Sequence, residues 1–518
     1  MLRLYIRLPP RELEVSLTGM SLTNDGAPAT APDAEKAARL NRLAVLLATG
    51  GLLLLMLAIA VFSNASADTW WHLATGRWIL DHFQVPHTDV FSFSAAGKPW
   101  ITHEYGAEVL MYLVFNAGGW PALALATAAV LMIGWWLVYR RCTGPALVNG
   151  AALLFGMWVA QPGMLLRPQT FSFLGGALFL WVLDRYYWDR DPRVLIWLPV
   201  TMLVWVQLHG GFVLGLAIAG AVLAGAVADR WLFGERKDVL KWKEIRPLAG
   251  ALAASAVVVP LNPNGLKLYE LPFYIMRMRI TPRITEWMPP LWSETRFQPF
   301  FVLLALTLAI MIVARKRYRM GQWLLFFGFA YAALHARRNI AVFPLVAVPL
   351  LAQGIRFPKA LSDLGMKIKP AIRVALALLL LALGARLAAQ QTSREVAFQQ
   401  YTARFGWPVA AAKYVVDHNL PPNLFNSYNY GGFLIWQLPP EYKVFIDGRA
   451  DVYGDDFIEN YQAVWGGNVN PDPTLNAYKI RTVLTEPDSG LARVLEEESK
   501  AGLWRKVYSD RLAVIFTR

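Results

Sequence analysis

Charged residues are scarce in this sequence. Asp, Glu, Lys and Arg make up 17% of the 518 residues, while hydrophobic residues make up 56% and the mean hydropathy is +0.36. Soluble domains carry roughly 25% charged residues, so the balance excludes an ordinary soluble protein. It indicates an integral membrane protein, and the 21 tryptophans suit a chain with many ends at the lipid–water interface.

Cysteine is almost absent, because Cys142 is the single one. One thiol excludes an intrachain disulfide and a CxxC metal site. The sequence also shows no internal repeat and no long low-complexity segment. The fold and the function must therefore be inferred from the apolar spans and the polar links between them.

The net charge of +14 does not indicate a nucleic-acid partner. The basic residues stand mostly in short loops between apolar spans, where anionic lipid and the orientation of the spans account for them. Membrane lipid is therefore the expected partner of this charge.

Apolar runs predict about eleven spans after a polar tail at residues 1–43, which ends in a short helix at Ala34–Arg42. They lie at 44–62, 120–139, 146–162, 170–187, 194–208, 211–228, 247–261, 299–314, 320–335, 340–354 and 373–390. Several are shorter than the roughly 20 residues that a bilayer needs. A cleaved signal peptide ending at Ala65–Ala67 is the alternative to a first span, but the leader is long for that.

Charge predicts the orientation of the spans. With the N-terminus inside the cytoplasmic membrane, the inner segments hold 26 Lys and Arg residues and the outer segments hold 10. That bias fits the positive-inside rule and places the C-terminus outside. The outer links then hold the unusual polar clusters: DTWWH, THEY, LRPQ, LHGG, LNPNG, TEW and HARRN.

The composition changes after the last span. Residues 391–518 alternate helix-like runs (Val409–His418, Ser489–Lys500) with strand-like runs (Lys443–Ile446, Arg481–Thr485, Leu512–Thr517). We therefore expect an α-helical polytopic membrane protein with a C-terminal α/β domain. The expected parts are a tail at 1–43, a transmembrane domain at 44–390 with a large outer loop at 63–119, and an extracytoplasmic domain at 391–518.

The first outer loop predicts two helices at the membrane surface, near 70–83 and 103–115. Asp68 opens the first of them. It is either an N-cap, a role that Thr69 can share, or a carboxylate that faces a cavity, and the two readings are compatible. His103 and Glu104 are either a helix start or, with Asp68 and His72, the ligands of a divalent metal.

Arginine on the outer side is disfavoured and therefore informative. Arg167, Arg337 and Arg338 predict a phosphate clamp, because guanidinium groups match phosphate oxygens. A cytoplasmic HARRN loop is the alternative for the last two. Other outer polar residues are candidates for substrate contact: His72, His209, Asn264, Glu286 and His335. Glu286 can equally be a solvated loop acid.

Two regions carry a resemblance to a known family. The first is DTWWHLATGRWILDHFQVPHTDVFSF followed by KPWITHEY, and the second is FNSYNYGGFLIW followed by VFIDGRADVYG. With a carboxylate after the first span and an outer α/β domain, the chain resembles the GT-C superfamily of membrane glycosyltransferases. That group includes the catalytic subunit of oligosaccharyltransferase, protein O-mannosyltransferases and the aminoarabinose transferase of lipid A. A strict DxD after the first span is missing, and NYGG lacks the tryptophans and the Asp of a WWDYG motif.

The resemblance implies transfer of a sugar from a polyprenyl-phosphate donor to a glycan, lipid or protein acceptor outside the membrane. Asp68 is the expected general base, and His103 and Glu104 are expected to orient it, hold the sugar or bind a divalent metal. A transporter or lipid flippase is the main alternative, although transporters often show repeats. A non-catalytic envelope assembly protein, in which Asp447, Arg449, Asp451 and Asp455 bind a partner, is the third.

Overall fold

The computed structural model describes residues 31–60, 66–234, 236, 239–355, 370–401 and 406–518. Most of the predicted tail lies outside these ranges. The helix expected at Ala34–Arg42 forms and is continuous with the first span, so both belong to one helix, α1 (Ala31–Ala60).

Helices overlap all the apolar runs of the sequence. Besides α1 they are α3 (Tyr105–Arg141), α4 (Ala146–Ala160), α5 (Gln169–Asp189), α6 (Trp197–Leu208), α7 (Val213–Phe233), α8 (Trp242–Val257), α10 (Gln298–Val313), α11 (Met320–His335), α12 (Pro344–Gly354) and α14 (Pro370–Tyr401). Among the described residues, six helices are long and apolar enough to cross a membrane by themselves. The fold is thus the expected polytopic helical one, and the number of crossings stays a prediction.

Lipid explains the distribution of apolar side chains over these helices. Trp135, Phe179 and Trp205 are buried where α3, α5 and α6 pack, and the rings of Phe179 and Trp205 meet edge to face at 5.7 Å. Large apolar side chains such as Val313 and Leu379 are exposed. A soluble protein rarely exposes so many, whereas a bilayer solvates them.

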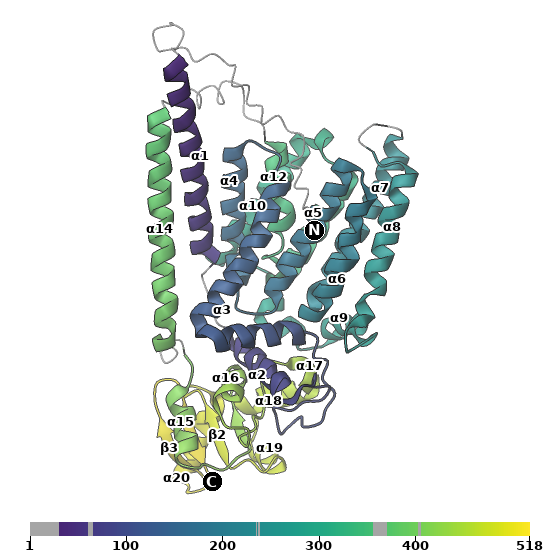
Figure 1. Cartoon of the computed structure of the whole chain (residues 1–518). Coiled ribbons are helices and arrows are strands. Elements are labelled where there is room, and N and C mark those ends of the chain that lie inside the picture. Colours follow the sequence, from purple (N-terminus) through teal and green to yellow (C-terminus); the bar gives the residue numbers. More distant parts are fainter. Residues whose placement is uncertain (1–30, 61–65, 235, 237–238, 356–369, 402–405) are drawn as a thin grey trace.

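A kink in α3 sets apart the helix that the sequence predicts before residue 115. Gly118 and Gly119 interrupt the helical geometry, and Gly119 has φ = 62°, a conformation that residues with a Cβ adopt rarely. The first part of α3 lies across the end of the helix bundle, and the second part enters it (Figure 1). Helix α2 (Ala67–His82), the other predicted surface helix, packs on α3 at the same end.

The predicted outer links gather at that one end of the bundle. They include the short helices η1 (Gln161–Gly163), η3 (Gly210–Phe212), η4 (Val259–Leu261), α9 (Lys267–Arg277), η5 (Thr281–Arg283), η6 (Thr285–Trp287), η7 (Thr295–Phe297) and η9 (Arg337–Asn339). The links η2 (Pro192–Ile196), between α5 and α6, and η8 (Arg315–Arg317), between α10 and α11, belong to the other ends of these helices. The back-and-forth course of the chain therefore brings distant polar clusters together.

The C-terminal part packs against α2 below the same end of the bundle (Figure 1). Its helices are α15 (Val409–Asp417), α16 (Tyr428–Gln437), α17 (Ala450–Tyr453), α18 (Asp455–Trp465), α19 (Asp472–Ala477) and α20 (Gly490–Lys500). Its strands are β1 (Leu424–Asn426), β2 (Thr482–Thr485), β3 (Arg505–Ser509) and β4 (Val514–Thr517). They form one sheet in the order β1-β2-β4-β3, and only β1 and β2 run parallel.

The prediction of a strand at Lys443–Ile446 is wrong. This apolar run makes only isolated bridges, in which Val444 pairs with Ser92 and Leu424. The side chain of Asn426 occupies the edge of β1 instead, because its Oδ1 accepts a hydrogen bond from the Phe445 N–H at 2.8 Å and its Nδ2 donates to the Ile446 carbonyl at 2.8 Å. An amide side chain thus replaces part of the ladder that a strand would have formed.

Candidate active site

Two carboxylates share one arginine at the centre of the gathered loops. Asp68 lies in the first turn of α2, Arg167 lies in the turn before α5, and Glu286 lies in η6. The Arg167 Nη2 is 2.7 Å from Asp68 Oδ2, and the Arg167 Nη1 is 3.3 Å from Glu286 Oε2. All three side chains are largely buried, and the Trp71 indole N–H also donates to Asp68 Oδ1 at 3.1 Å.

Asp68 is not the N-cap of its helix. Ser66 holds that position, and its backbone N–H donates to the Thr69 hydroxyl at 3.1 Å. The Asp68 carboxylate is therefore free of a capping role and points at Arg167, while the Thr69 hydroxyl also donates to the Leu166 carbonyl at 2.9 Å.

The environment separates the proton affinities of the two carboxylates. Burial raises the pKa of Asp68, and Arg167 offsets this only in part. Burial also opposes ionisation of Glu286, but Arg167 and Arg338 outweigh it and lower the pKa of Glu286. Asp68 is consequently the better proton acceptor of the two, and Glu286 is the one that stays ionised.

Three histidines surround Glu104 beside this centre. Its Oε1 is 3.1 Å from His209 Nε2 and 3.5 Å from His103 Nε2, and its Oε2 is 3.6 Å from His72 Nδ1. Burial disfavours the charged form of His103, but Glu104 outweighs this and raises the pKa of His103 to about 9. Burial lowers the pKa of His209 to about 4 and that of His72 to about 3. At neutral pH, His103 thus carries the positive charge opposite Glu104.

The LHGG turn fixes the tautomer of His209. Its Nδ1 accepts a hydrogen bond from the Gly211 N–H at 2.9 Å and lies 2.6 Å from the Ser172 hydroxyl, which itself accepts from the Trp205 indole N–H at 2.9 Å. A neutral imidazole with an accepting Nδ1 carries its proton on Nε2. His209 therefore donates to Glu104 and holds that carboxylate in place.

Three residues of this cluster have side chains that commonly bind metal ions. One ligand atom each of His72, Glu104 and Glu108 lies within 4.8 Å of the others. Glu108 Oε2 is buried and has no hydrogen-bond partner among the described residues, while Glu108 Oε1 is 3.0 Å from His72 Nδ1. Two of the expected ligands thus lie here, but Asp68 pairs with Arg167, and Glu108 was missed because it stands in the apolar run of α3.

The arginines of HARRN differ in their partners. Arg337 pairs with Glu294 and packs on the ring of Phe297 at 5.2 Å. Arg338 has no ion pair or hydrogen bond within the described ranges, and its guanidinium lies 4.5 Å from the Trp287 ring centroid. Burial is the main reason why the pKa of Arg338 is lowered. Arg338 is the member of the expected clamp that remains available to an anion.

The remaining candidates lie on either side of the site. Asn264 donates from Nδ2 to the Thr102 carbonyl at 3.2 Å and so supports the chain just before His103. His335 is exposed at the end of α11 and packs on Tyr331 at 4.2 Å. Among the described residues, His335 contacts none of the ionisable groups of the site.

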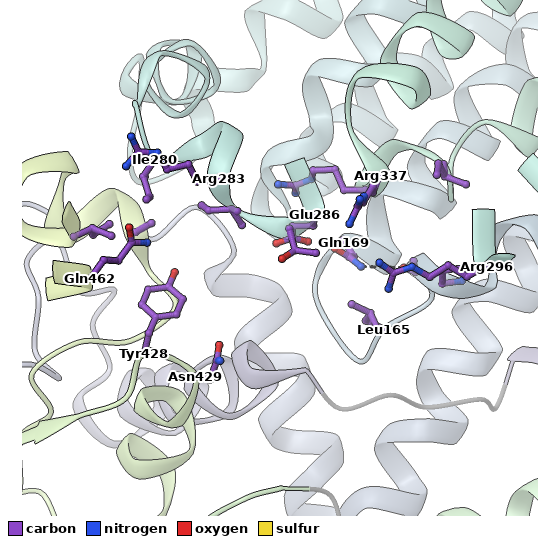
Figure 2. Close-up of a pocket in the computed structure, with 18 of the residues that line it drawn as sticks. Leu165, Gln169, Ile280, Arg283, Glu286, Arg296, Arg337, Tyr428, Asn429 and Gln462 are labelled. Atoms are coloured by element: carbon purple, nitrogen blue, oxygen red, sulfur yellow. Dashed lines mark hydrogen bonds between the residues drawn. The ribbon is translucent and has the colours of Figure 1, made fainter. Parts of the chain in front are cut away.

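A cavity of about 510 Å³ opens between these loops and the C-terminal part. Glu286, Arg337 and Arg338 line it from the bundle, and Tyr428 and Gln462 line it from the C-terminal part. Figure 2 shows Tyr428, Asn429 and Gln462 on one side of the space and Glu286, Gln169 and Arg337 on the other. The cavity therefore has two walls that come from distant parts of the sequence.

The C-terminal part also reaches Asp68 directly, through the turn Asp447–Arg449. Gly448 lies so close that a Cβ on it would stand 2.1 Å from Asp68 Oδ1 and 3.2 Å from the Trp71 Nε1. Arg449 anchors this turn, because its guanidinium is 2.7 Å from Asp89 Oδ1 and 2.6 Å from Asp447 Oδ2.

Burial makes the Asp447–Arg449 anchor rigid. The side chains of Arg449, Asp89 and Asp447 are at most 1% exposed, and the Tyr453 hydroxyl donates to Asp447 Oδ2 at 2.6 Å. The Arg449 guanidinium also lies 4.5 Å from the Trp100 ring. The first outer loop and the C-terminal part are thus joined by a buried ion pair next to Asp68.

Known structures resemble this arrangement. The apo oligosaccharyltransferase of Archaeoglobus fulgidus superposes with a TM-score of 0.50 at 14% identity, over 86% of this chain and 69% of that one. ArnT from Cupriavidus metallidurans gives 0.47 at 12% identity, over 91% and 97%. No family model and no curated protein sequence matches the chain.

The fold is GT-C-like. The superposition at 14% identity shows the architecture and leaves the chemistry to the residues of this chain. Within the GT-C-like fold, the sequence-based candidates Asp68, Arg167 and Glu286 come together, as do His103, Glu104 and His209. Residues of the cavity wall such as Gln462, Trp465 and Glu486 had no motif that singled them out.

Proposed function

We propose that this chain is a membrane glycosyltransferase that transfers a sugar from a polyprenyl-phosphate-linked donor to an acceptor, with Asp68 as the general base. The observation that carries the proposal is the site itself. A largely buried carboxylate with a raised pKa lies behind a cavity that contains Arg338, an arginine without an ion pair among the described residues, and both stand at one end of a GT-C-like helical bundle.

Arg338 is the proposed ligand of the donor phosphate. The other arginines of the cavity face carboxylates: Arg283 faces Glu459, and Arg296 and Arg337 both face Glu294. An unpaired, partly buried guanidinium lacks such a partner and gains one when a phosphate enters. The prenyl tail would lie between the helices, where apolar contacts contribute affinity without selecting a sequence or sugar.

Arg167 has a different proposed role from simple phosphate binding. It already lies between Asp68 and Glu286, so two negative charges surround its one positive charge. In this position it orients the Asp68 carboxylate and contributes positive charge near the phosphate as the leaving group departs. Arg337 would support Arg338 by fixing the loop that carries it.

Asp68 alone can supply the proton chemistry of the transfer. As the acceptor oxygen bonds to the anomeric carbon, the bond from that carbon to the phosphate oxygen breaks, and its electron pair leaves with the polyprenyl phosphate. The acceptor hydroxyl proton passes to Asp68. Because the phosphate is a stable anion, the leaving group needs no protonated acid, in contrast to the two carboxyl groups of a glycoside hydrolase.

The Glu104 cluster is the proposed sugar-positioning and metal-binding element. His72, Glu104 and Glu108 offer the nitrogen and carboxylate ligands that a divalent cation takes, and the unpartnered Glu108 oxygen fits such an ion. The ion would supply positive charge near the donor. Metal content of the purified protein before and after EDTA treatment tests this, and Glu108→Gln should lower the bound metal.

The membrane setting follows from the same proposal. The charge bias favours a chain that spans the cytoplasmic membrane with its N-terminus in the cytoplasm. Residues 391–518 would then form the outer domain. Single cysteines at His103, His209 and Arg338, in a chain whose Cys142 is replaced, should react with a membrane-impermeant reagent in intact cells. Protection of any of the three until the cells are opened would contradict this orientation.

The deciding experiment is transfer of a labelled sugar from a lipid-linked donor in membranes. Asp68→Asn should abolish product formation while leaving expression and membrane insertion intact. Asp417→Asn, at an exposed ion pair with Lys413 on α15, is the matched control and should leave transfer unchanged. Full activity of Asp68→Asn would remove Asp68 from the mechanism, and uptake of the donor without covalent product would indicate transport.

A further inference from the structure

The two walls of the 510 Å³ cavity differ in charge. The bundle wall carries Glu286 together with Arg296, Arg337 and Arg338, and of these arginines Arg338 has no ion pair in the described part of the chain. The wall from the C-terminal part carries Trp465 and Glu486. Anions are attracted to the first wall and repelled by the carboxylate of the second. One cavity therefore offers separate places to a phosphate-bearing ligand and to an uncharged one.

The parallel strand pair of the C-terminal sheet builds the second wall. β1 and β2 are parallel neighbours, with Asn426 opposite Leu484, so the residues that follow both strands meet at one edge of the sheet. Tyr428 follows β1 and Glu486 follows β2, and both line the cavity. The carboxyl ends of parallel strands are where open α/β sheets commonly bind ligands.

Glu486 is held through one of its two carboxylate oxygens. Its Oε2 accepts hydrogen bonds from the Ser427 hydroxyl, from the Trp465 indole N–H at 3.1 Å and from the Thr485 hydroxyl at 3.3 Å. No described residue bonds to Oε1. Three donors on one oxygen fix the carboxylate and the indole ring together, and Oε1 remains as an acceptor for a ligand.

Amide groups complete this wall. Asn429 at the start of α16 and Gln462 on α18 line the cavity, and neither side chain has a hydrogen-bond partner in the described part of the chain. Figure 2 shows both beside Tyr428. Each amide both donates and accepts, which matches hydroxyl groups, since these also do both.

We infer that this wall, formed by Tyr428, Asn429, Gln462, Trp465 and Glu486, is the acceptor subsite and that the acceptor is a neutral glycan. A sugar ring has an apolar C–H face for an aromatic ring and a rim of hydroxyls for amides and a carboxylate. Glu486 disfavours an anionic acceptor. This assignment rests on the proposed function, and it selects one of the acceptor classes that the proposal leaves open.

Binding of the protein to an array of immobilised ligands tests the acceptor assignment without the donor and without transfer. The full-length protein in nanodiscs would be applied to neutral glycans, phosphorylated glycans and peptides on the array. We expect binding to neutral glycans and a loss of at least tenfold in Gln462→Ala and Glu486→Gln. Glu496→Gln, at an exposed ion pair with Lys506, is the matched control.

The outcomes separate the inference from the proposed function. Gln462 is exposed and makes no described side-chain bond, so Gln462→Ala keeps the test valid even if Glu486→Gln fails to fold. Binding of peptides or phosphorylated glycans alone, binding of no glycan, or undiminished binding in Gln462→Ala would overturn the acceptor assignment. Failure of the proposed function would appear elsewhere, as transfer that persists in Asp68→Asn.

Discussion

Gly448→Ala should disable the site from outside the membrane domain. The new Cβ would stand 2.1 Å from Asp68 Oδ1, whereas ordinary van der Waals contact begins at 3.4 Å. The Arg449 anchor is buried and doubly paired, so the turn that carries Gly448 cannot easily retreat. The carboxylate of Asp68, at the end of a side chain, is the group that moves.

The geometry sets the size of the effect. The carboxylate must shift by roughly 1 Å, and a misplacement of that size at a reacting group can cost about 100-fold in rate. The shift also lengthens the 2.7 Å contact with Arg167 and disturbs the bond from the Trp71 indole. We therefore expect kcat to fall by about 100-fold, with little change in expression, because the clash involves a movable side chain rather than backbone.

The assay is transfer of a labelled sugar from a lipid-linked donor, with thermal unfolding as the measure of folding. Gly250→Ala on α8 is the control, because a Cβ there meets nothing within 4 Å. If Gly448→Ala keeps full activity, the close approach of this turn to a reacting Asp68 is refuted. If it unfolds, the turn supports the fold and not the carboxylate alone.

Three further predictions follow from charge and burial. Because burial raises the pKa of Asp68, the loss of kcat/KM in acid should occur above pH 3.8, and Glu286→Gln should move it to lower pH by removing a neighbouring negative charge. A pH–rate profile that moves the other way would contradict the pairing. Arg338→Ala should raise the KM for the donor by about 10- to 100-fold, as expected for a lost bond to a charged group. Arg337→Ala should raise it less, since Arg337 already faces a carboxylate, and equal effects would argue against the distinction. Arg449→Ala leaves the buried carboxylates of Asp89 and Asp447 without their ion-pair partner, which costs about 3–5 kcal/mol of stability. Unfolding of the purified protein at an unchanged temperature would contradict this.

The hydropathy pattern of the sequence was enough to predict most of the helices. The run at Met320–His335 became a helix with those bounds, and the two helices expected in the first loop are present, while their place at the membrane surface stays a prediction. The apolar pattern of a helix is a property of consecutive residues, so the local sequence is enough to predict the helix. The prediction of a strand at Lys443–Ile446 was wrong, because the Asn426 side chain, 20 residues before Ile446, replaces part of the ladder, and apolar periodicity does not report such a side-chain contact.

The sequence indicated which residues belong to the site more readily than which of them form ion pairs. The sequence placed Asp68, Arg167 and Glu286 on one side of the membrane, but only packing shows that Arg167 faces both carboxylates and that Arg338 faces none. Glu108 stood in an apolar run and carried no signal. These relations depend on contacts between segments that are 36 to 119 residues apart in the chain, and no spacing in a single sequence encodes them.

In the proposed mechanism, the lipid phosphate of the donor binds beside Arg338, at the end of the helix bundle that carries Asp68. A structure of the Asp68→Asn protein with a bound polyprenyl-phosphate sugar tests it most directly. We expect a phosphate oxygen within hydrogen-bond distance of the Arg338 guanidinium and the sugar between the phosphate and residue 68. A phosphate bound at the opposite end of the bundle, beside Arg141 and Arg319, would contradict it.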